Sequence, residues 1–202
     1  MQIANNKYGM AIKFTKNQIL ILEIFFNNPE KSYYLRELGR MLSKQPGVFQ
    51  REINKLTKDN FLISEYQASS RYFKLNKNHP LFNELKSIFF KTLGAEGRLK
   101  GLLVKVKNIE TAFIYGSFAK NKEDQFSDID LMIIGAPDED ILISKISKIE
   151  GEIGREINYT IFSPQDLKNG LTKKEVFLED IIKGPKIFII GDQYVLEKII
   201  RK

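Results

Sequence analysis

Residues 112–134 form the most informative segment of the chain, AFIYGSFAKNKEDQFSDIDLMII. It begins with a short apolar strand, turns at Gly116 and Ser117, and passes through ten further residues before a second strand, DIDLMII. Side chains alternate between the two faces of a strand, so Asp128 and Asp130 are expected on the same face. The stretch therefore predicts two acids at the mouth of an otherwise apolar strand.

Two carboxylates one pleat apart repel each other, and an ionised pair in such a place needs a cation. Asp128 and Asp130 therefore predict a divalent metal site, for Mg²⁺ or Mn²⁺. Gly116 lets the backbone approach a ligand, and the Ser117 hydroxyl with the following N–H groups can donate to phosphate oxygens. These are the parts that nucleotidyl transfer requires. The alternative is that Arg or Lys side chains pair with the two acids and no metal binds.

Residues from about 95 to 202 resemble the nucleotidyltransferase superfamily related to DNA polymerase β, and within it the minimal nucleotidyltransferase domains. The resemblance rests on the GS and DID motifs and on the tail FLEDIIKGPKIFIIGD. It implies that Gly116 and Ser117 hold the triphosphate of an NTP and that Asp128 and Asp130 bind the metals. The implied reaction is transfer of a nucleoside monophosphate to an acceptor that the sequence does not identify.

The chain departs from the pattern of that superfamily at Lys120 and Asn121, where many relatives have a Gly after a basic residue, and at a third acidic residue on a neighbouring strand, which bears on catalysis. The corresponding strand here is REINYTIFSP, residues 155–164. It places Asn158 at the position of the third acid, with Glu156 two residues earlier on the same face. Asn can offer one carbonyl oxygen to a metal but cannot act as a base. The candidate catalytic residues are therefore Asp128, Asp130, Asn158 and Glu156, and catalysis depends on whether Glu156 takes the third role.

The first half of the chain predicts three short helices closed by a hairpin. Thr15 is a typical N-cap, Pro29 stops the first helix, and the second and third helices flank a turn, SKQPG. Two β-rich runs, LISEY and RYFKLN, then flank the short polar connection QASS. The expected elements are helices at 15–28, 35–42 and 48–63 and strands at 62–66 and 71–76.

This order of elements resembles the winged helix-turn-helix of small bacterial and archaeal transcriptional regulators, from residue 15 to about 80. The resemblance implies that the third helix enters the major groove of double-stranded DNA and that the hairpin is the wing. Arg and Lys would neutralise phosphates, while Gln and Asn could contact base edges. The implied DNA-binding residues are Ser43, Lys44, Gln45, Gln50, Arg51, Asn54 and Lys55, with Ser69, Ser70 and Arg71 in the wing.

The charge of the chain is unevenly distributed. Residues 1–97 contain 15 Lys and Arg against 8 Asp and Glu, which gives +7, and residues 98–202 contain 17 of each, so the whole net charge of +7 lies in the first half. A basic half joined to a neutral half is typical of a nucleic-acid-binding module fused to another domain. Lys-rich surfaces without an anionic partner, and winged helices that serve dimerisation or protein docking, are the alternatives.

Composition excludes several classes of protein. Without cysteine the chain forms no disulfide and has no cysteine nucleophile, and its single histidine, His79, is expected to cap or pack. No apolar run approaches a membrane span and the first residues lack a signal peptide, so a cytoplasmic protein with no membrane partner is expected.

The predicted fold class is α+β, with an N-terminal winged helix-turn-helix and an α/β nucleotidyltransferase-type domain on a small mixed sheet. The expected domains are a winged helix at 1–80, a connector helix at 81–97 and a nucleotidyltransferase-like domain at 98–202. The apolar stripe of the connector either packs on the hairpin or forms the seam of a homodimer. Three functions remain open: a DNA-binding regulator that transfers a nucleoside monophosphate, a catalytically inactive NTP sensor or scaffold, and a toxin-antitoxin-type protein that modifies a protein acceptor.

Overall fold

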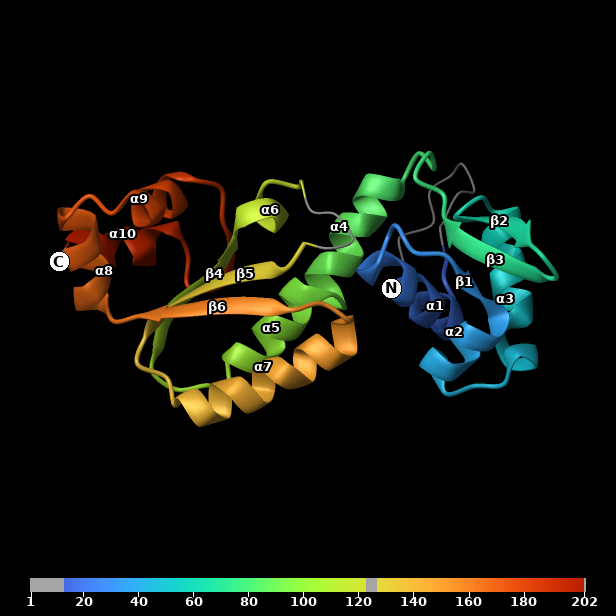
Figure 1. Cartoon of the computed structure of the whole chain (residues 1–202), viewed down its shortest axis with the longest axis horizontal. Helices are drawn as coiled ribbons and strands as arrows, with labels where there is room; N and C mark the ends of the chain where they lie inside the picture. Colours follow the sequence, from blue (N-terminus) through green and yellow to red (C-terminus); the bar gives the residue numbers. More distant parts are fainter. Residues whose placement is uncertain (1–12, 123–126, 202) are drawn as a thin grey trace. The chain divides into compact units, whose positions relative to one another are not determined.

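The computed structural model describes residues 13–122 and 127–201. The chain divides into two compact units, residues 1–89 and 90–202. Each unit has a sheet of its own, with three strands in the first and four in the second among the described residues. The elements of both units are labelled in Figure 1.

The first helix, α1 (Lys16–Asn27), begins where the sequence predicts because Thr15 and Gln18 cap each other. The Gln18 N–H donates to the Thr15 hydroxyl at 3.2 Å, and the Thr15 N–H donates to the Gln18 side chain at 2.9 Å. This reciprocal pair satisfies two N–H groups that a helix start otherwise leaves without partners. Leu22 and Phe25 on the inner face are fully buried.

The second helix, α2 (Leu35–Leu42), matches its predicted range, whereas the third differs at both ends. The helix expected at 48–63 is α3 (Pro46–Lys58). It starts two residues earlier because proline fits the first turn, where its missing N–H is not needed. It ends earlier because the chain turns into the left-handed region at Asn60, with φ of 60°.

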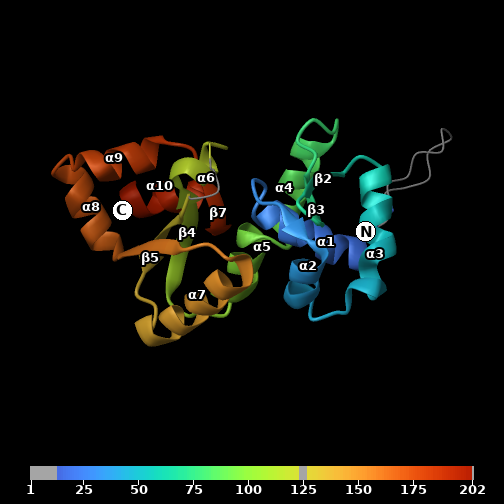
Figure 2. The same cartoon turned by 45° about the vertical axis from the view of Figure 1, so that its right-hand side comes forward.

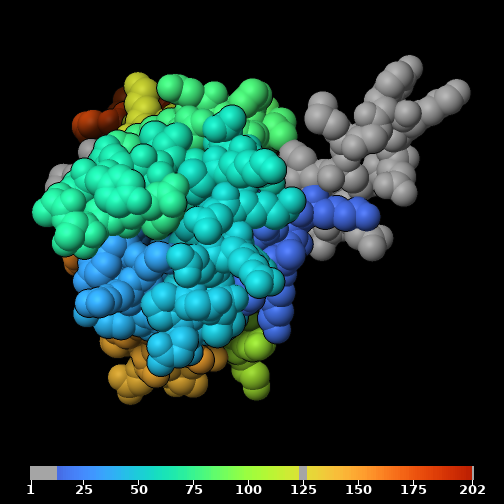
Figure 3. Space-filling model, turned by 90° about the vertical axis from the view of Figure 1, so that its right-hand side faces the viewer, coloured from blue at the N-terminus to red at the C-terminus, as the bar shows by residue number. Residues whose placement is uncertain are grey.

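The hairpin follows α3 as predicted, with a tighter turn. Strands β2 (Leu62–Gln67) and β3 (Ser70–Leu75) pair antiparallel, so only Ala68 and Ser69 connect them, and Ala68 has φ of 52°. The short strand β1 (Tyr33–Tyr34) pairs with β3 and completes a sheet of order β1-β3-β2. In Figure 3, α3 in cyan and the hairpin in blue-green form neighbouring parts of the same face.

His79 has the structural role expected of it. Its ring Nδ1 accepts a hydrogen bond from the Leu81 N–H at 3.1 Å, and the ring lies 4.2 Å from that of Phe61. Helix α4 (Phe82–Thr92) begins directly afterwards, and the division between the two units falls inside it. A separate connector helix at 81–97 stays a prediction. The domain limits at residues 80 and 98 also stay predictions.

The second unit contains a four-stranded sheet of order β6-β5-β4-β7. The β4–β5 and β4–β7 pairs are antiparallel and the β5–β6 pair is parallel. This confirms a mixed α+β fold with small sheets. The strands are β4 (Ile109–Tyr115), β5 (Ile129–Gly135), β6 (Ile157–Phe162) and β7 (Ile187–Ile190).

Helices cover both faces of this sheet, as Figures 1 and 2 show. One core cluster joins Leu131 and Ile133 of β5 to α5 and α7, and another joins Met132 and Ile134 to α8, α9 and α10. Strand β5 is therefore buried on both faces. The covering helices are α5 (Ala95–Leu103) and α7 (Glu139–Ile153) on one face and α8 (Pro164–Thr172), α9 (Val176–Lys183) and α10 (Gln193–Arg201) on the other.

The segment between β4 and β5, expected to be a loop, contains the short helix α6 (Gly116–Ala119). Residues 123–126 of that predicted loop lie outside the described residues. Among the helices of the described ranges, none is both long enough and apolar enough to cross a membrane.

Candidate functional site

Gly116 and Asp130 lie against each other in the site. Gly116 follows β4 directly and has φ of 69°, in the left-handed region that favours glycine. A Cβ atom at this position would lie 2.2 Å from the Asp130 Oδ2, so the carboxylate lies directly against the glycine backbone. The GS motif and the DID motif, separated by ten residues in the sequence, therefore meet in space.

The acids lie on the sheet face that α8, α9 and α10 cover. Asp130 precedes Met132 and Ile134 on the same side of β5, because side chains alternate along a strand, and both of these belong to the core cluster of that face. Asp128 comes immediately before β5, two residues earlier on the same side. Both acids are half-buried. The predicted shared face of Asp128 and Asp130 agrees with this geometry.

Asn158 completes a small group of oxygen-bearing side chains. It is the direct register partner of Asp130 in the parallel β5–β6 pair. Its side-chain Nδ2 donates a hydrogen bond to the Asp128 Oδ2 at 3.2 Å. The amide therefore lies beside the acids at the position expected for a third carboxylate, while Asn158 itself remains exposed.

Glu156 stands apart from this group. It is exposed, and its backbone carbonyl accepts a hydrogen bond from the Ile129 N–H at 2.9 Å. Within the described ranges, no three His, Asp or Glu side chains come together as a metal-binding group. Glu156 therefore does not form a third carboxylate with Asp128 and Asp130 in this structure.

The charge state of Asp130 reflects its surroundings. Burial raises the pKa of the Asp130 carboxyl, and the neighbouring charge of Asp128 raises it further. Both effects disfavour an ionised pair of carboxylates. A bound cation would offset the repulsion between the two negative charges. Two carboxylates and one amide are hard oxygen ligands of the kind that Mg²⁺ and Mn²⁺ prefer. The residues present therefore fit one divalent cation held by Asp128 and Asp130, with Asn158 as a neutral neighbour.

Arg155 supports the segment that leads into the acids. Its guanidinium donates to the Ser127 carbonyl at 2.8 Å, immediately before Asp128, and lies over the Phe118 ring at 5.3 Å. Ser117, the other residue of the GS motif, is half-buried in α6. Arg155 therefore joins the start of β5 to the helix that carries Ser117.

An aromatic pair, of which Tyr115 lies beside Asp130, was not predicted. Tyr115 is the cross-strand partner of Asp130, and its ring centroid lies 6.2 Å from that of Phe177 on α9, with the rings at 80°. Burial raises the pKa of the Tyr115 hydroxyl, the charge of Asp130 adds to this, and a hydrogen bond with Thr160 opposes it. The sequence placed Tyr115 in the strand, but the contact with Phe177 joins positions too distant to pair by pattern.

The residues predicted to bind DNA differ in their surroundings. Gln50, Arg51 and Asn54 are exposed on successive turns of α3, and Ser43 and Gln45 are exposed just before it. Three of the predicted cations have partners inside the unit. Lys44 donates to Asn17 at 2.5 Å, Lys55 lies 3.6 Å from Asp59, and Arg71 donates to the Ser64 hydroxyl at 2.9 and 3.1 Å.

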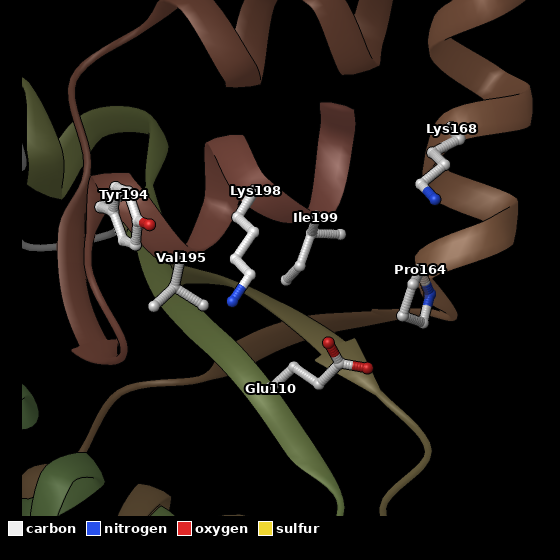
Figure 4. Close-up of a pocket in the computed structure, with 7 residues that line it drawn as sticks. All are labelled: Glu110, Pro164, Lys168, Tyr194, Val195, Lys198 and Ile199. Atoms are coloured by element: carbon white, nitrogen blue, oxygen red, sulfur yellow. The ribbon is translucent and has the colours of Figure 1, made fainter. Parts of the chain in front are cut away.

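A pocket of about 360 Å³ lies at the opposite end of β4 from Gly116. Figure 4 shows Glu110 of β4 facing the same hollow as Lys198 of α10, with Lys168 of α8 at its side. The register places Glu110 near Gly135, at the far end of β5 from the acids. This pocket is therefore not part of the site formed by Asp128 and Asp130.

Part of the second unit is similar to a known protein family. Residues 98–193 match the family model described as polymerase beta, nucleotidyltransferase. The chain therefore carries a nucleotidyltransferase-like domain. A search of curated proteins gave no match.

Two solved structures are similar to part of the chain. One is a toxin–antitoxin structure with AMP-PNP, with 15% identity and a TM-score of 0.38 over 52% of this chain and 81% of the other. The second is a mutant of the toxin–antitoxin pair MntA–HpeT, with 14% identity and a TM-score of 0.40 over 53% of this chain and 82% of the other.

Proposed function

We propose that the second unit binds a nucleoside triphosphate with a divalent cation and transfers the nucleoside monophosphate to an acceptor. The observation that carries the proposal is the contact between Gly116 and the Asp130 carboxylate. This contact brings the predicted phosphate-binding turn and the predicted metal-binding acids to one place. A nucleotidyltransferase-like domain at 98–193 supports the same function.

Each residue has a role that follows from its chemistry. Asp128 and Asp130 would hold the cation, which supplies neutralisation of the phosphate charge when bound. The Ser117 hydroxyl would donate to a phosphate oxygen, and Gly116 leaves the backbone open to the triphosphate. In the reaction an acceptor hydroxyl oxygen forms a bond to the α-phosphorus, the bond from that phosphorus to the pyrophosphate oxygen breaks, and the hydroxyl proton passes to a base or to water.

The identity of that base separates an enzyme from a nucleotide sensor. Asn158 lies where the superfamily resemblance predicts a carboxylate, and an amide does not accept the proton at neutral pH. Glu156 is exposed and outside the group of acids. We therefore propose that the domain binds NTP tightly and transfers the nucleoside monophosphate slowly. If transfer is absent altogether, the protein acts as a nucleotide sensor.

The test is calorimetric titration of the full chain with the α,β-methylene analogue of ATP in the presence of Mg²⁺. Asp128→Ala and Asp130→Ala should each abolish the Mg²⁺-dependent heat. Asp140→Ala, an exposed acid on α7, is the matched control and should bind as the wild type does. Unchanged affinity in both site variants would refute the metal site.

We also propose a second function, in which the first unit is a winged helix-turn-helix that binds duplex DNA. The observation in favour is the order of elements α1-β1-α2-α3-β2-β3, with Gln50, Arg51 and Asn54 exposed together on α3. The excess positive charge of the first half supports it. The function of a DNA-binding transcriptional regulator rests on this proposal.

The test is titration of a fluorescent duplex with the full chain at several salt concentrations. Binding should weaken steeply with salt because counterions are released. Arg51→Ala should weaken it and lower the slope of the salt dependence by about one, as expected for the loss of one phosphate contact. Lys105→Ala, an exposed lysine in the second unit, is the control. No binding at low salt would instead favour a role in dimerisation or protein docking.

A further inference from the structure

Helix α9 begins with two large apolar side chains that face solvent. Val176 is 73% exposed and Phe177 is 54% exposed, whereas Leu178 is fully buried. Single exposed apolar residues are common and need no explanation. The position of Phe177 beside the candidate site is what distinguishes it from the other exposed residues.

One side chain separates Phe177 from the acids. Tyr115 lies directly opposite Asp130 in the β4–β5 pair, so the two side chains project from the same face of the sheet. The Tyr115 ring then meets the Phe177 ring edge to face, with centroids 6.2 Å apart and an interplanar angle of 80°. An aromatic surface therefore continues from the acids to the start of α9.

The helix that carries Phe177 is closely packed. Leu178 belongs to the core cluster of this face of the sheet, together with Ile181. A Cβ atom on Gly170 of α8 would lie 2.3 Å from the Leu178 Cδ1, so α8 and α9 approach each other closely at this point. Phe177 is therefore an aromatic ring exposed on a well-supported helix, which lowers the entropy lost when a ligand stacks on it.

We infer that Phe177 is the stacking surface for the nucleobase of the bound NTP. The inference rests on the proposed function, because it takes the triphosphate at Gly116 and Ser117 and the cation at Asp128 and Asp130. A nucleotide carries its base and its phosphates at opposite ends, and Phe177 is the exposed aromatic ring that Tyr115 links to the acids. Stacking on a ring is tolerant of base identity. The site should therefore accept all four NTPs and bind the larger purines more tightly.

The first experiment uses the absence of tryptophan from the chain. Phe177→Trp keeps an aromatic surface and introduces a single tryptophan, which can be excited at wavelengths where the eight tyrosines do not absorb. The Mg²⁺ complex of α,β-methylene ATP should quench this fluorescence, because a base stacks on the indole. The Mg²⁺ complex of inorganic tripolyphosphate, which has no base, should leave the fluorescence nearly unchanged. Equal responses to both ligands, or no response to the nucleotide, would overturn the stacking role.

The second experiment compares affinities in Phe177→Ala and the wild type. The affinity for α,β-methylene ATP should fall roughly five- to 150-fold, the range found for loss of one stacking ring. The affinity for tripolyphosphate should not change. Tyr194→Ala removes a more exposed ring on α10, near the pocket at the far end of β4, and should bind both ligands as the wild type does.

The two proposals fail in different ways. If the wild type binds both ligands and Phe177→Ala binds them equally well, the stacking role is wrong and the proposed NTP site stands. If the wild type binds neither ligand with Mg²⁺, the proposed NTP site is wrong and the stacking role falls with it. A loss confined to the nucleotide in Phe177→Ala supports both proposals.

Discussion

Gly116 occupies a position that leaves no room for a side chain. Its φ of 69° is costly for other residues, and a Cβ atom would lie 2.2 Å from the Asp130 Oδ2. The carboxylate of Asp130 would have to move to accept an alanine there. Glycine is therefore required at position 116 both by the backbone conformation and by the position of the Asp130 carboxylate.

We predict that Gly116→Ala abolishes Mg²⁺-dependent binding of α,β-methylene ATP, because it displaces one of the two acids. Gly151→Ala is the matched control, since a Cβ at Gly151 in α7 has no neighbour within 4 Å. That control should bind normally and should be more stable by roughly 0.5–1 kcal/mol, the gain from alanine within a helix. Normal binding by Gly116→Ala in calorimetric titrations would contradict the site geometry.

A second prediction concerns the missing carboxylate. Asn158→Asp should raise transfer of the nucleoside monophosphate from labelled ATP, because it places a ligand and a base opposite Asp130. Glu156→Gln should change transfer little, since Glu156 lies outside the group of acids. The measurement is incorporation of label by the full chain incubated with candidate acceptors. Strong activity of the wild type that disappears in Glu156→Gln would assign the third role to Glu156 instead.

Single residues of the site were predictable to different degrees. The alternation of a strand was enough to place Asp128 and Asp130 on one face, and the parallel register puts Asn158 beside them as the superfamily resemblance implied. Phe177 was not predictable, because its contact with Tyr115 joins residues far apart in the sequence. The partner of Lys44 in the first unit, Asn17, was missed for the same reason, whereas the bond from Arg71 to Ser64 crosses the hairpin between residues that are close in the sequence.

Helix caps explain why the start of α1 could be predicted from the sequence. Thr15 and Gln18 form a complete capping box whose two residues are only three apart. The ends of α3 were harder to predict, since they depend on Pro46 in the first turn and on the left-handed backbone of Asn60. Strand β4 begins at Ile109, before the predicted start at 112, because the polar Glu110 and Thr111 interrupt the apolar pattern.

For the first helix we predict that Thr15→Ala lowers the free energy of unfolding of the first unit by about 1 kcal/mol, the usual cost of losing an N-cap. Thr57→Ala is the control, because Thr57 lies in α3 of the same unit and its hydroxyl donates to the Ile53 carbonyl one turn earlier in the helix. Such a bond adds little stability to a helix. Urea titration followed by circular dichroism measures both variants, and an equal effect of the two would contradict the role of the cap.

In the molecule as a whole, the excess positive charge and the candidate site residues lie in different halves of the sequence. The excess positive charge lies in residues 1–97, whereas the acids of the site lie in the second unit. Because the proposed DNA contacts and the proposed NTP contacts share no residue, the two kinds of binding should be separable by single substitutions.

We therefore predict that Asp130→Ala loses binding of α,β-methylene ATP with Mg²⁺ and keeps the affinity for duplex DNA. Arg51→Ala should show the opposite pattern. Each variant serves as the control for the other in fluorescence titrations with a DNA duplex and in calorimetry with the nucleotide. Loss of both kinds of binding in either variant would indicate that the two functions use a common surface.

We expect strand β5 to hold the candidate site in place while less enclosed parts of the second unit open. Proteins open first where few apolar contacts hold the backbone, and last at their most enclosed strands. β5 is hydrogen-bonded along both edges by β4 and β6, and its residues Leu131 to Ile134 are fully buried. Their amides should exchange with deuterium only when the entire unit opens. The acids at the start of this strand are therefore attached to the part of the unit expected to open last, so surface helices could open and close without disrupting the proposed cation site.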